Sequence, residues 1–513
     1  MEQSFEPRGK LLARNTLLNV GGNLAPLLVG VFSIPYIIRG LGTAGFGILS
    51  IAWVFLAYLS FLDLGFGVAA TKYVAECIGR NEKDEIPQWV WTSIELELVF
   101  GVIGALIIGA ATPFVVDHVL KISPVLRHDA KVSFILLGAS LPVVLVTNGL
   151  RAVLVAAQRF DLINAVRVPV NISIFLLPAI ALPFGFRLPG IILLLVLARI
   201  AGAVAILMLV LAVFPSLRSG LSFNPKLIRP LASFGGWSTI SNVLGSLQMY
   251  IDRLVIGAVV SVAAVSYYAA PSEVITRAGF LLPSSLMATL FPAFSNLDAS
   301  GARERITDFF VRSLKLLLLV LGPTLLTVAI FAHPILRFWL GENFAARSSS
   351  VLQILAAGVL INALSSVPYC LLPGVGRPDV PAKLHLVEFP VYTVMLWFFV
   401  RQGGVIGAAF AWTLGMALYG ILLYAACYKI KIIPFRFIGE RHFLRSVAAV
   451  LGLALGFLIT LAVTKGLLAR GFFSCLLLSI FGIGAWAFAL DDADRSLLAS
   501  AVGRVSGVVG GTR

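Results

Sequence analysis

The chain has 513 residues, of which 59% are hydrophobic and 12% are charged, and its mean hydropathy is +0.98. A soluble domain carries about a quarter charged residues, so a water-soluble globular core is excluded and lipid is the expected solvent for most side chains. The formal net charge of +15 therefore indicates an oriented membrane protein, with no nucleic acid as partner.

Hydrophobic stretches follow one another along the chain, and each is long enough to cross a bilayer as a helix of about 20 residues. Fourteen are predicted, at 15–38, 45–71, 88–116, 132–157, 162–184, 188–215, 230–259, 263–294, 308–336, 348–373, 380–400, 403–428, 443–464 and 471–490. The sequence therefore predicts an all-α polytopic membrane protein.

Basic residues gather in segments that lie on the same face as the N-terminus. The richest segments are 72–87, 216–229, 295–315 and 429–445. Because Lys and Arg accumulate in cytoplasmic loops, both termini are predicted to be cytoplasmic. The N-terminal segment is polar and basic and leads directly into a full-length span, so this span is expected to insert the chain without a cleavable signal peptide.

The first twelve spans are predicted to form two related halves of six. Three groups of residues recur at a nearly constant spacing: Asn23 with Asn242, Arg159 and Asp161 with Arg377 and Asp379, and Gly190 with Gly407. An even number of spans returns the chain to the same face, so the halves form a parallel repeat about the membrane normal. The predicted parts are an N-lobe (1–215), a cytoplasmic linker (216–229), a C-lobe (230–428), an appended helix pair (443–490) and a poorly ordered cytoplasmic tail (491–513).

Four charged residues are expected at similar depth in the seventh and eighth spans. Asp252 and Arg253 precede an uncharged turn near residue 262 by about as many residues as Glu273 follows it, and Arg277 shares a helix face with Glu273. Charges at membrane depth are costly and usually face a cavity or one another. The cluster is therefore either a substrate anchor, an ion-coupled switch, or a structural ion pair between the two spans.

Other polar residues in the spans suggest a hydrated interior. Asn23 and Asn242 belong to matching polar stripes and are predicted to line a common cavity; the alternative is hydrogen bonding between packed helices. Asp63 is either an ion-coupling carboxylate, since burial favours its protonated form, or the partner of an arginine. Glu95 and Glu97 are expected near the cytoplasmic interface.

The sequence predicts no enzyme chemistry. It contains neither a GxxxxGK[ST] phosphate loop nor an HExxH zinc motif, and its four cysteines lack the paired spacing of a metal site. Catalytic residues, a metal and a cofactor are therefore not predicted, and the cysteines are expected to be packing residues.

Three segments resemble one family, the polysaccharide-biosynthesis flippases of the multidrug/oligosaccharidyl-lipid/polysaccharide exporter superfamily. The segments are 37–76, which contains FLDLGFG, 150–168, which contains QRFD, and 223–277, which contains the Asp252–Arg253 pair. The resemblance implies a two-lobed MATE-like fold of twelve to fourteen helices. It also implies an inner-membrane protein that moves undecaprenyl-pyrophosphate-linked oligosaccharides to the outer leaflet for O-antigen, exopolysaccharide or capsule synthesis.

The implied substrate gives the charged residues their expected roles. Arg199, Arg253 and Arg277 are candidates to bind the diphosphate, together with Asn23 and Asn242, while Asp63, Asp252 and Glu273 are candidates for ion coupling or charge pairing. The spans depart from a clearly cationic cavity, because four arginines (Arg151, Arg199, Arg253, Arg277) face six acids (Asp63, Glu95, Glu97, Asp252, Glu273, Glu388). Expected partners are membrane lipids, a polysaccharide polymerase and a chain-length regulator.

Two other functions remain open at this stage. The first is an ion-coupled multidrug or small-molecule antiporter of the same fold. The second is a membrane-embedded polymerase or ligase of the same pathway. The second is disfavoured because such enzymes tend to carry a large periplasmic loop, whereas the longest outer connection expected here is 117–131.

Overall fold

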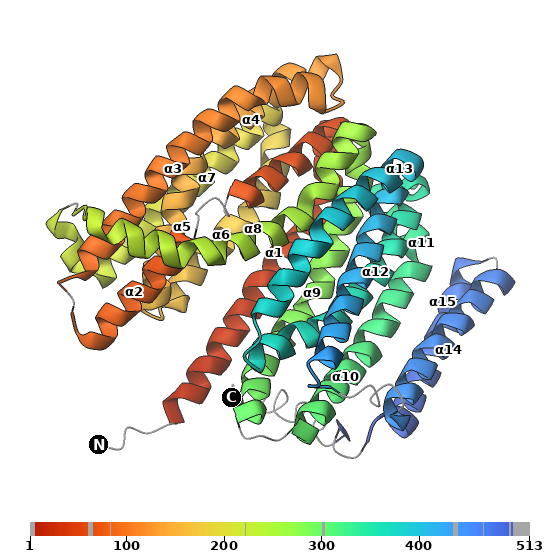
Figure 1. The fold of residues 1–513 in the computed structure, drawn as a ribbon. Coiled ribbons are helices and arrows are strands. Elements are labelled where there is room, and N and C mark those ends of the chain that lie inside the picture. The colour runs from red at the N-terminus through yellow and green to blue at the C-terminus, as the bar shows by residue number, and fades with distance from the viewer. Residues whose placement is uncertain are drawn as a thin grey trace, which may run out of the picture. The chain divides into compact units, whose positions relative to one another are not determined.

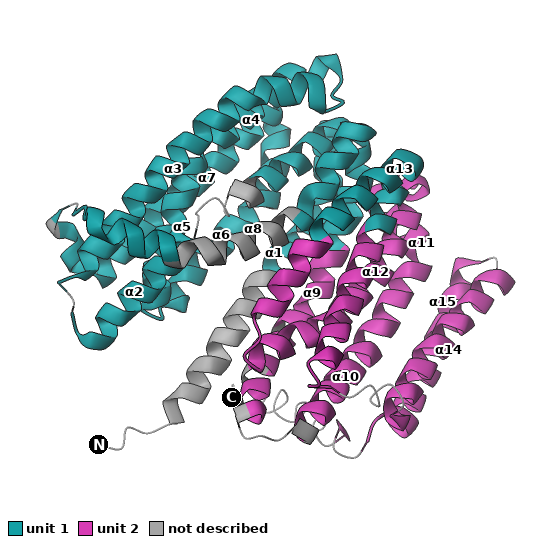
Figure 2. Cartoon of the chain, viewed as in Figure 1, with its two compact units in different colours: residues 1–274, 389–411 teal, residues 275–388, 412–513 magenta. Residues whose placement is uncertain are grey.

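The computed structural model describes residues 6–59, 65–82, 84–220, 222–299, 303–433, 440–464, 466–491 and 494–495, and within these ranges it describes no side chains for 6–23, 56–59, 219, 234–247, 249, 285, 288, 289, 292, 296, 299, 303 and 304. Every regular element of these residues is helical (Figure 1). The prediction of an all-α chain is therefore confirmed. The helices gather into two compact units, 1–274 with 389–411 and 275–388 with 412–513 (Figure 2).

The first unit contains the helices from the N-terminal half of the chain. These are α1 (Glu6–Leu59), α2 (Phe66–Arg80), α3 (Ile86–Phe114), α4 (Pro124–Ala139), α5 (Leu141–Ala156), α6 (Phe160–Ala181), α7 (Leu188–Val213) and α8 (Ile228–Val259). Short helical turns stand at Val115–Val119, Leu182–Phe184, Pro215–Ser219 and Pro225–Leu227. The beginning of α9 (Val262–Ala299) completes this unit, with residues 389–411 of α13.

The second unit contains the rest of α9 and the C-terminal helices. These are α10 (Arg303–Ile330), α11 (Ala332–Leu340), α12 (Glu342–Gly374), the remainder of α13 (Asp379–Lys429), α14 (Arg441–Val463) and α15 (Leu467–Gly484), which ends in a turn at Ala485–Ala489. These units are defined by contacts between helices and not by the internal repeat of the sequence. The predicted lobes at 1–215 and 230–428 therefore stay a prediction.

Ten helices among the described residues are long and apolar enough to cross a membrane. The predicted number of fourteen spans stays a prediction, partly because two predicted boundaries fall inside single helices. The boundary near residue 42 lies within α1 and the boundary near 402 within α13. At these points Gly42 (φ 72°) and Gly404 (φ 55°) adopt a left-handed backbone that a residue with a Cβ rarely adopts, so the chain turns there without a long loop.

Two turns of the chain give the predicted repeat a structural counterpart. Arg159 donates from Nε and Nη2 to the carboxylate of Asp161 at 3.0 Å each, at the start of α6. Arg377 does the same to Asp379 at 3.0 and 3.3 Å, at the start of α13. The residue before each arginine has a positive φ, 56° at Gln158 and 79° at Gly376. Chain geometry and side-chain pairing therefore recur together at the repeat spacing.

The C-terminal helix pair is attached to α10 by charged side chains. Lys315 lies 3.3 Å from Asp491 and also contacts Asp494, which is completely buried; Arg312 contacts Asp494 at 2.9 Å. Below these pairs Leu319 packs on the apolar residues at the end of α15. The first residues of the predicted tail are thus held against a membrane helix, whereas 496–513 lie outside the described residues.

Candidate functional site

The charged residues of α8 and the first part of α9 form one buried cluster. The Arg253 guanidinium donates from Nη2 to Oε2 of Glu273 at 2.6 Å, and the two side chains are 4% and 8% exposed. The Tyr268 hydroxyl donates to Asp252, whose other oxygen accepts the Arg253 backbone N–H at 2.7 Å. The ring of Tyr250 lies 5.5 Å from the guanidinium carbon and adds a cation–π contact.

The turn between α8 and α9 sets the depth of this cluster. The Ser261 hydroxyl accepts the backbone N–H of Ala264 in the first turn of α9, and α9 begins at Val262, only three residues after α8 ends. Lys121, which lies in the connection just before α4, also contacts this turn. Its backbone N–H donates to the Gly257 carbonyl at 3.0 Å, and its carbonyl accepts the backbone N–H of Val262 at 3.3 Å. Because the hairpin is tight, residues equally distant from the turn meet, and Arg253 pairs with Glu273 across it, which is one of the alternatives that the sequence left open.

The geometry of the cluster is that of a closed ion pair. The Arg253 guanidinium donates to Glu273, and the Arg253 backbone N–H donates to Asp252. Removing ions from water costs several kcal/mol each, and only such short, well-aligned contacts offset this cost. With Asp252, Arg253 and Glu273 all less than a tenth exposed, the cluster joins α8 to α9 and offers no open cation to a ligand in this conformation.

Arg199 and Arg277 have different surroundings. Arg199 lies in the middle of α7 and is partly exposed, and no described acidic side chain lies within ion-pair distance of it. Arg277 is four residues beyond Glu273 on α9 and its side chain is exposed. Asp63 lies outside the described residues, and so do the side chains of Asn23 and Asn242. Their predicted roles in substrate binding and ion coupling stay predictions.

Some polar residues of the membrane helices are placed differently from the sequence expectation. Glu97 on α3 is completely buried, and a Cβ on Gly149 of α5 would overlap its carboxylate, so the carboxylate is enclosed by protein and does not reach solvent. Arg167, half-buried on α6, was missed. The sequence does show a cation seven residues after the start of α6. A position near the membrane interface was equally consistent with that spacing, so the spacing alone did not mark Arg167 as a site residue.

A second buried carboxylate lies on α13. Glu388 is completely buried, its Oε2 is 3.6 Å from Nδ1 of His385, and the His385 ring stacks on Tyr419 with ring centres 4.1 Å apart. The sequence placed Glu388 in a span but did not pair it with a histidine.

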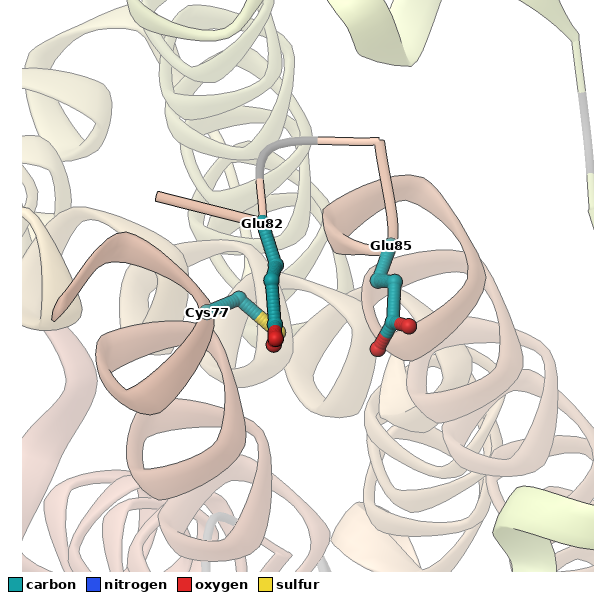
Figure 3. Close-up of side chains that lie close together, drawn as sticks. All are labelled: Cys77, Glu82 and Glu85. Carbon is teal, nitrogen blue, oxygen red and sulfur yellow. The ribbon is translucent and has the colours of Figure 1, made fainter. Parts of the chain in front are cut away.

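Three possible metal ligands meet at the end of α2, Cys77, Glu82 and Glu85, with one ligand atom of each within 4.8 Å of the others (Figure 3). The two carboxylates are exposed, whereas Cys77 packs in the core with Val74 and Val90. Burial, together with the charges of Glu85 and Glu82, raises the pKa of the Cys77 thiol. A metal ligand must be the thiolate, so this arrangement suits packing better than metal binding.

Solved structures define the class of fold. "Lipid II flippase MurJ, inward closed conformation" matches with a TM-score of 0.72 at 15% identity, over 92% of this chain and 98% of that chain. "Inward-facing conformation of a multidrug resistance MATE family transporter of the MOP superfamily" matches with a TM-score of 0.67 at 16% identity, over 80% and 98%. The chain therefore has the polytopic membrane-transporter fold that these proteins share.

Within this fold the sequence defines the family. The family model "Polysaccharide biosynthesis protein" matches residues 12–298, more than half of the chain, and the model "MatE" matches 238–399. The chain belongs to the polysaccharide biosynthesis protein family, which confirms the resemblance found in its sequence.

Curated relatives match over most of the chain. "Putative O-antigen transporter" of Shigella flexneri is 28% identical over 413 residues, which is 80% of this chain and 96% of the relative. "Probable flippase AglR" of Haloferax volcanii is 22% identical over 82% of this chain and 84% of the relative. The names describe those proteins, and both concern transport across a membrane.

Proposed function

We propose that this protein is a flippase that moves undecaprenyl-pyrophosphate-linked oligosaccharide units across the inner membrane for polysaccharide synthesis. The observation that carries the proposal is the match to the O-antigen transporter of Shigella flexneri, which extends over 96% of that relative. Such coverage leaves the relative no large additional domain that could hold a separate activity. The polytopic helical fold supports the same function, because a substrate with a polar glycan needs a protein path through lipid.

Arg199 is our proposed ligand for the diphosphate. A cation at the centre of an apolar helix is costly unless it faces a cavity or a partner, and no described acid pairs with Arg199. A guanidinium binds phosphate oxygens through two parallel N–H groups and sheds little hydration on binding. Arg253 is less suited to this role because it is buried and its Nη2 already donates to Glu273.

The proposed transport cycle is alternating access without covalent chemistry. The diphosphate and glycan would occupy a polar interior while the prenyl chain stays in lipid, and an ion gradient or the membrane potential would supply energy. We place both termini in the cytoplasm, on the distribution of basic residues. A polysaccharide polymerase and a chain-length regulator would receive the substrate on the outer side.

The antiporter alternative rests on the match to the MatE model at 238–399. This segment is shorter than the 12–298 match to the polysaccharide biosynthesis model. The MATE structures are about 15% identical to this chain and support the fold alone. Flippase activity is therefore the better-supported proposal.

Reconstituted vesicles provide the test. The full chain is inserted into vesicles that contain an undecaprenyl-pyrophosphate disaccharide, and a membrane-impermeant oxidant reports the glycan that reaches the outer leaflet. We expect translocation above that of protein-free vesicles, and no ethidium transport in the same preparation. Ethidium transport without glycan translocation would favour the antiporter and reject the flippase.

A further inference from the structure

An apolar cavity of about 620 Å³ lies within the second unit, between α10, α12, α13 and α14. Its lining includes Leu314, Leu318, Leu364, Tyr424, Val447 and Val450. The hydroxyl of Tyr424 is already used, because it donates to the Leu364 carbonyl at 3.0 Å. A cavity with almost no polar group on its wall does not hold ordered water, and such cavities bind apolar molecules instead. In a membrane the abundant apolar molecules are lipid chains.

The cavity belongs to one leaflet. On α13 its wall extends from Ile421 to Tyr428, and on α14 from Phe443 to Leu451. Eight helical residues rise about 12 Å, less than half of the roughly 30 Å hydrocarbon core. Since α13 ends at Lys429 and α14 begins at Arg441, the cavity lies at the end of the membrane where these two helices meet the surface.

Basic residues are neighbours in the sequence of residues that line the cavity. Lys429 follows Tyr428 in the chain, Lys431 lies two residues further, and Arg441 lies two residues before Phe443. All three cations are exposed, and Glu440 is the acid among these described neighbours. A basic group next to an opening between membrane helices attracts the head group of an anionic lipid, at about 1 kcal/mol per cation.

We propose that this cavity is a binding site for an anionic diacyl phospholipid, with an acyl chain between α13 and α14 and the phosphate on Lys429, Lys431 and Arg441. The lipid fills the space between α14 and the helices α10, α12 and α13, and so helps to hold the appended helix pair. The lipid carrier of a flippase has to pass from one leaflet to the other. A cavity confined to one leaflet therefore fits a resident lipid and not the transported one.

Native mass spectrometry of the detergent-purified full chain tests the proposal. The protein is titrated with dioleoyl phosphatidylglycerol and, separately, with dioleoyl phosphatidylcholine. We expect at least one phosphatidylglycerol to bind preferentially, and the triple variant K429Q/K431Q/R441Q to weaken that binding by tenfold or more, on the order of the three charges removed. The matched control R218Q/K226Q/R229Q removes three exposed cations from the 216–229 segment and should leave the binding unchanged.

A second variant tests the cavity independently of charge. Val447→Trp places a bulky ring in the space and should reduce the binding of phosphatidylglycerol while the charge stays the same; thermal unfolding checks that the variant is folded. Equal binding of both phospholipids, or binding unchanged in the triple variant, would reject the site. Displacement of phosphatidylglycerol by undecaprenyl phosphate, with the same sensitivity to the variants, would reassign the cavity to the carrier and also reject the proposal.

Discussion

Two arginines in the first unit show how differently a membrane helix can hold a cation. Arg253 on α8 is 4% exposed and contacts Glu273 at 2.6 Å, and Asp252 and the Tyr250 ring complete its surroundings. Arg199 on α7 is partly exposed and has no acidic partner among the described residues. The first arginine is occupied by the protein itself, whereas the second can bind an anion from outside. Position in a span alone does not distinguish them.

Replacing Arg253 is expected to give the largest loss of stability. Arg253→Ala leaves Glu273 buried without its cation, which costs about 3–5 kcal/mol of unfolding free energy. The abundance of folded protein in membranes, measured by fluorescence-detected chromatography, should fall sharply. The control Arg159→Ala removes an arginine that also pairs with a carboxylate but whose side chain is 45% exposed, and it should cost at most about 1 kcal/mol.

The double variant Arg253→Met with Glu273→Leu sharpens this interpretation. Replacing both members of a buried pair by apolar residues is often neutral, because the desolvation cost of both ions is removed. Recovery of most of the lost abundance is therefore expected. An equally unstable double variant would show that the cluster contributes more than a paired charge.

Lys315 in the second unit should rank next. Lys315→Ala removes a cation that contacts Asp491 and Asp494, but Arg312 remains beside Asp494, so the cost should be about 2–3 kcal/mol. The effect should be local, and limited proteolysis should cut near the end of α15 first. Lys383→Ala, at an exposed pair with Asp379, is the control and should change little. Unchanged proteolysis of the Lys315 variant would contradict the attachment of the helix pair to α10.

Tyr268→Phe should have a smaller effect. The substitution removes one hydrogen bond to Asp252, which keeps the backbone N–H of Arg253 as a donor, so about 1.5 kcal/mol is expected. Thermal unfolding in detergent measures it. A loss as large as that of Arg253→Ala would mean that Asp252, and not Glu273, is the main partner in the cluster.

Arg199→Ala should have the smallest effect on stability. No ion pair among the described residues is broken, and removing a cation from the middle of a membrane helix does not destabilise it. Membrane abundance should equal that of the unmodified protein or exceed it. A marked fall in abundance would show that Arg199 has a structural partner, and the contrast with Arg253 would fail.

The sequence was sufficient for features that depend on local pattern. Hydropathy predicted the helices, and equal spacing around residue 262 predicted that Arg253 and Glu273 lie at similar depth; the tight hairpin brings them into contact. The recurrence of Arg159 and Asp161 at Arg377 and Asp379 was also visible.

Contacts between helices distant in the chain were not predictable. The burial of Glu97 against Gly149 depends on how α3 packs on α5. The pairing of Lys315 with Asp494 joins α10 to residues that follow the last span and had the composition of a free tail. Neither the spacing nor the polarity of these residues contains information on their partners.

The central claim is that Arg199, which has no acidic partner among the residues that the structure describes, serves the anionic substrate, and one measurement tests this claim most directly. The rate of glycan translocation per folded protein is compared in vesicles for Arg199→Ala, Arg199→Lys and the double variant Arg253→Met with Glu273→Leu. Loss of a bidentate phosphate contact should slow Arg199→Ala about tenfold or more, and the lysine variant should retain part of the rate. The double variant should translocate at nearly the normal rate. Full translocation by Arg199→Ala, together with loss of translocation in a folded double variant, would contradict the account and assign the substrate to Arg253.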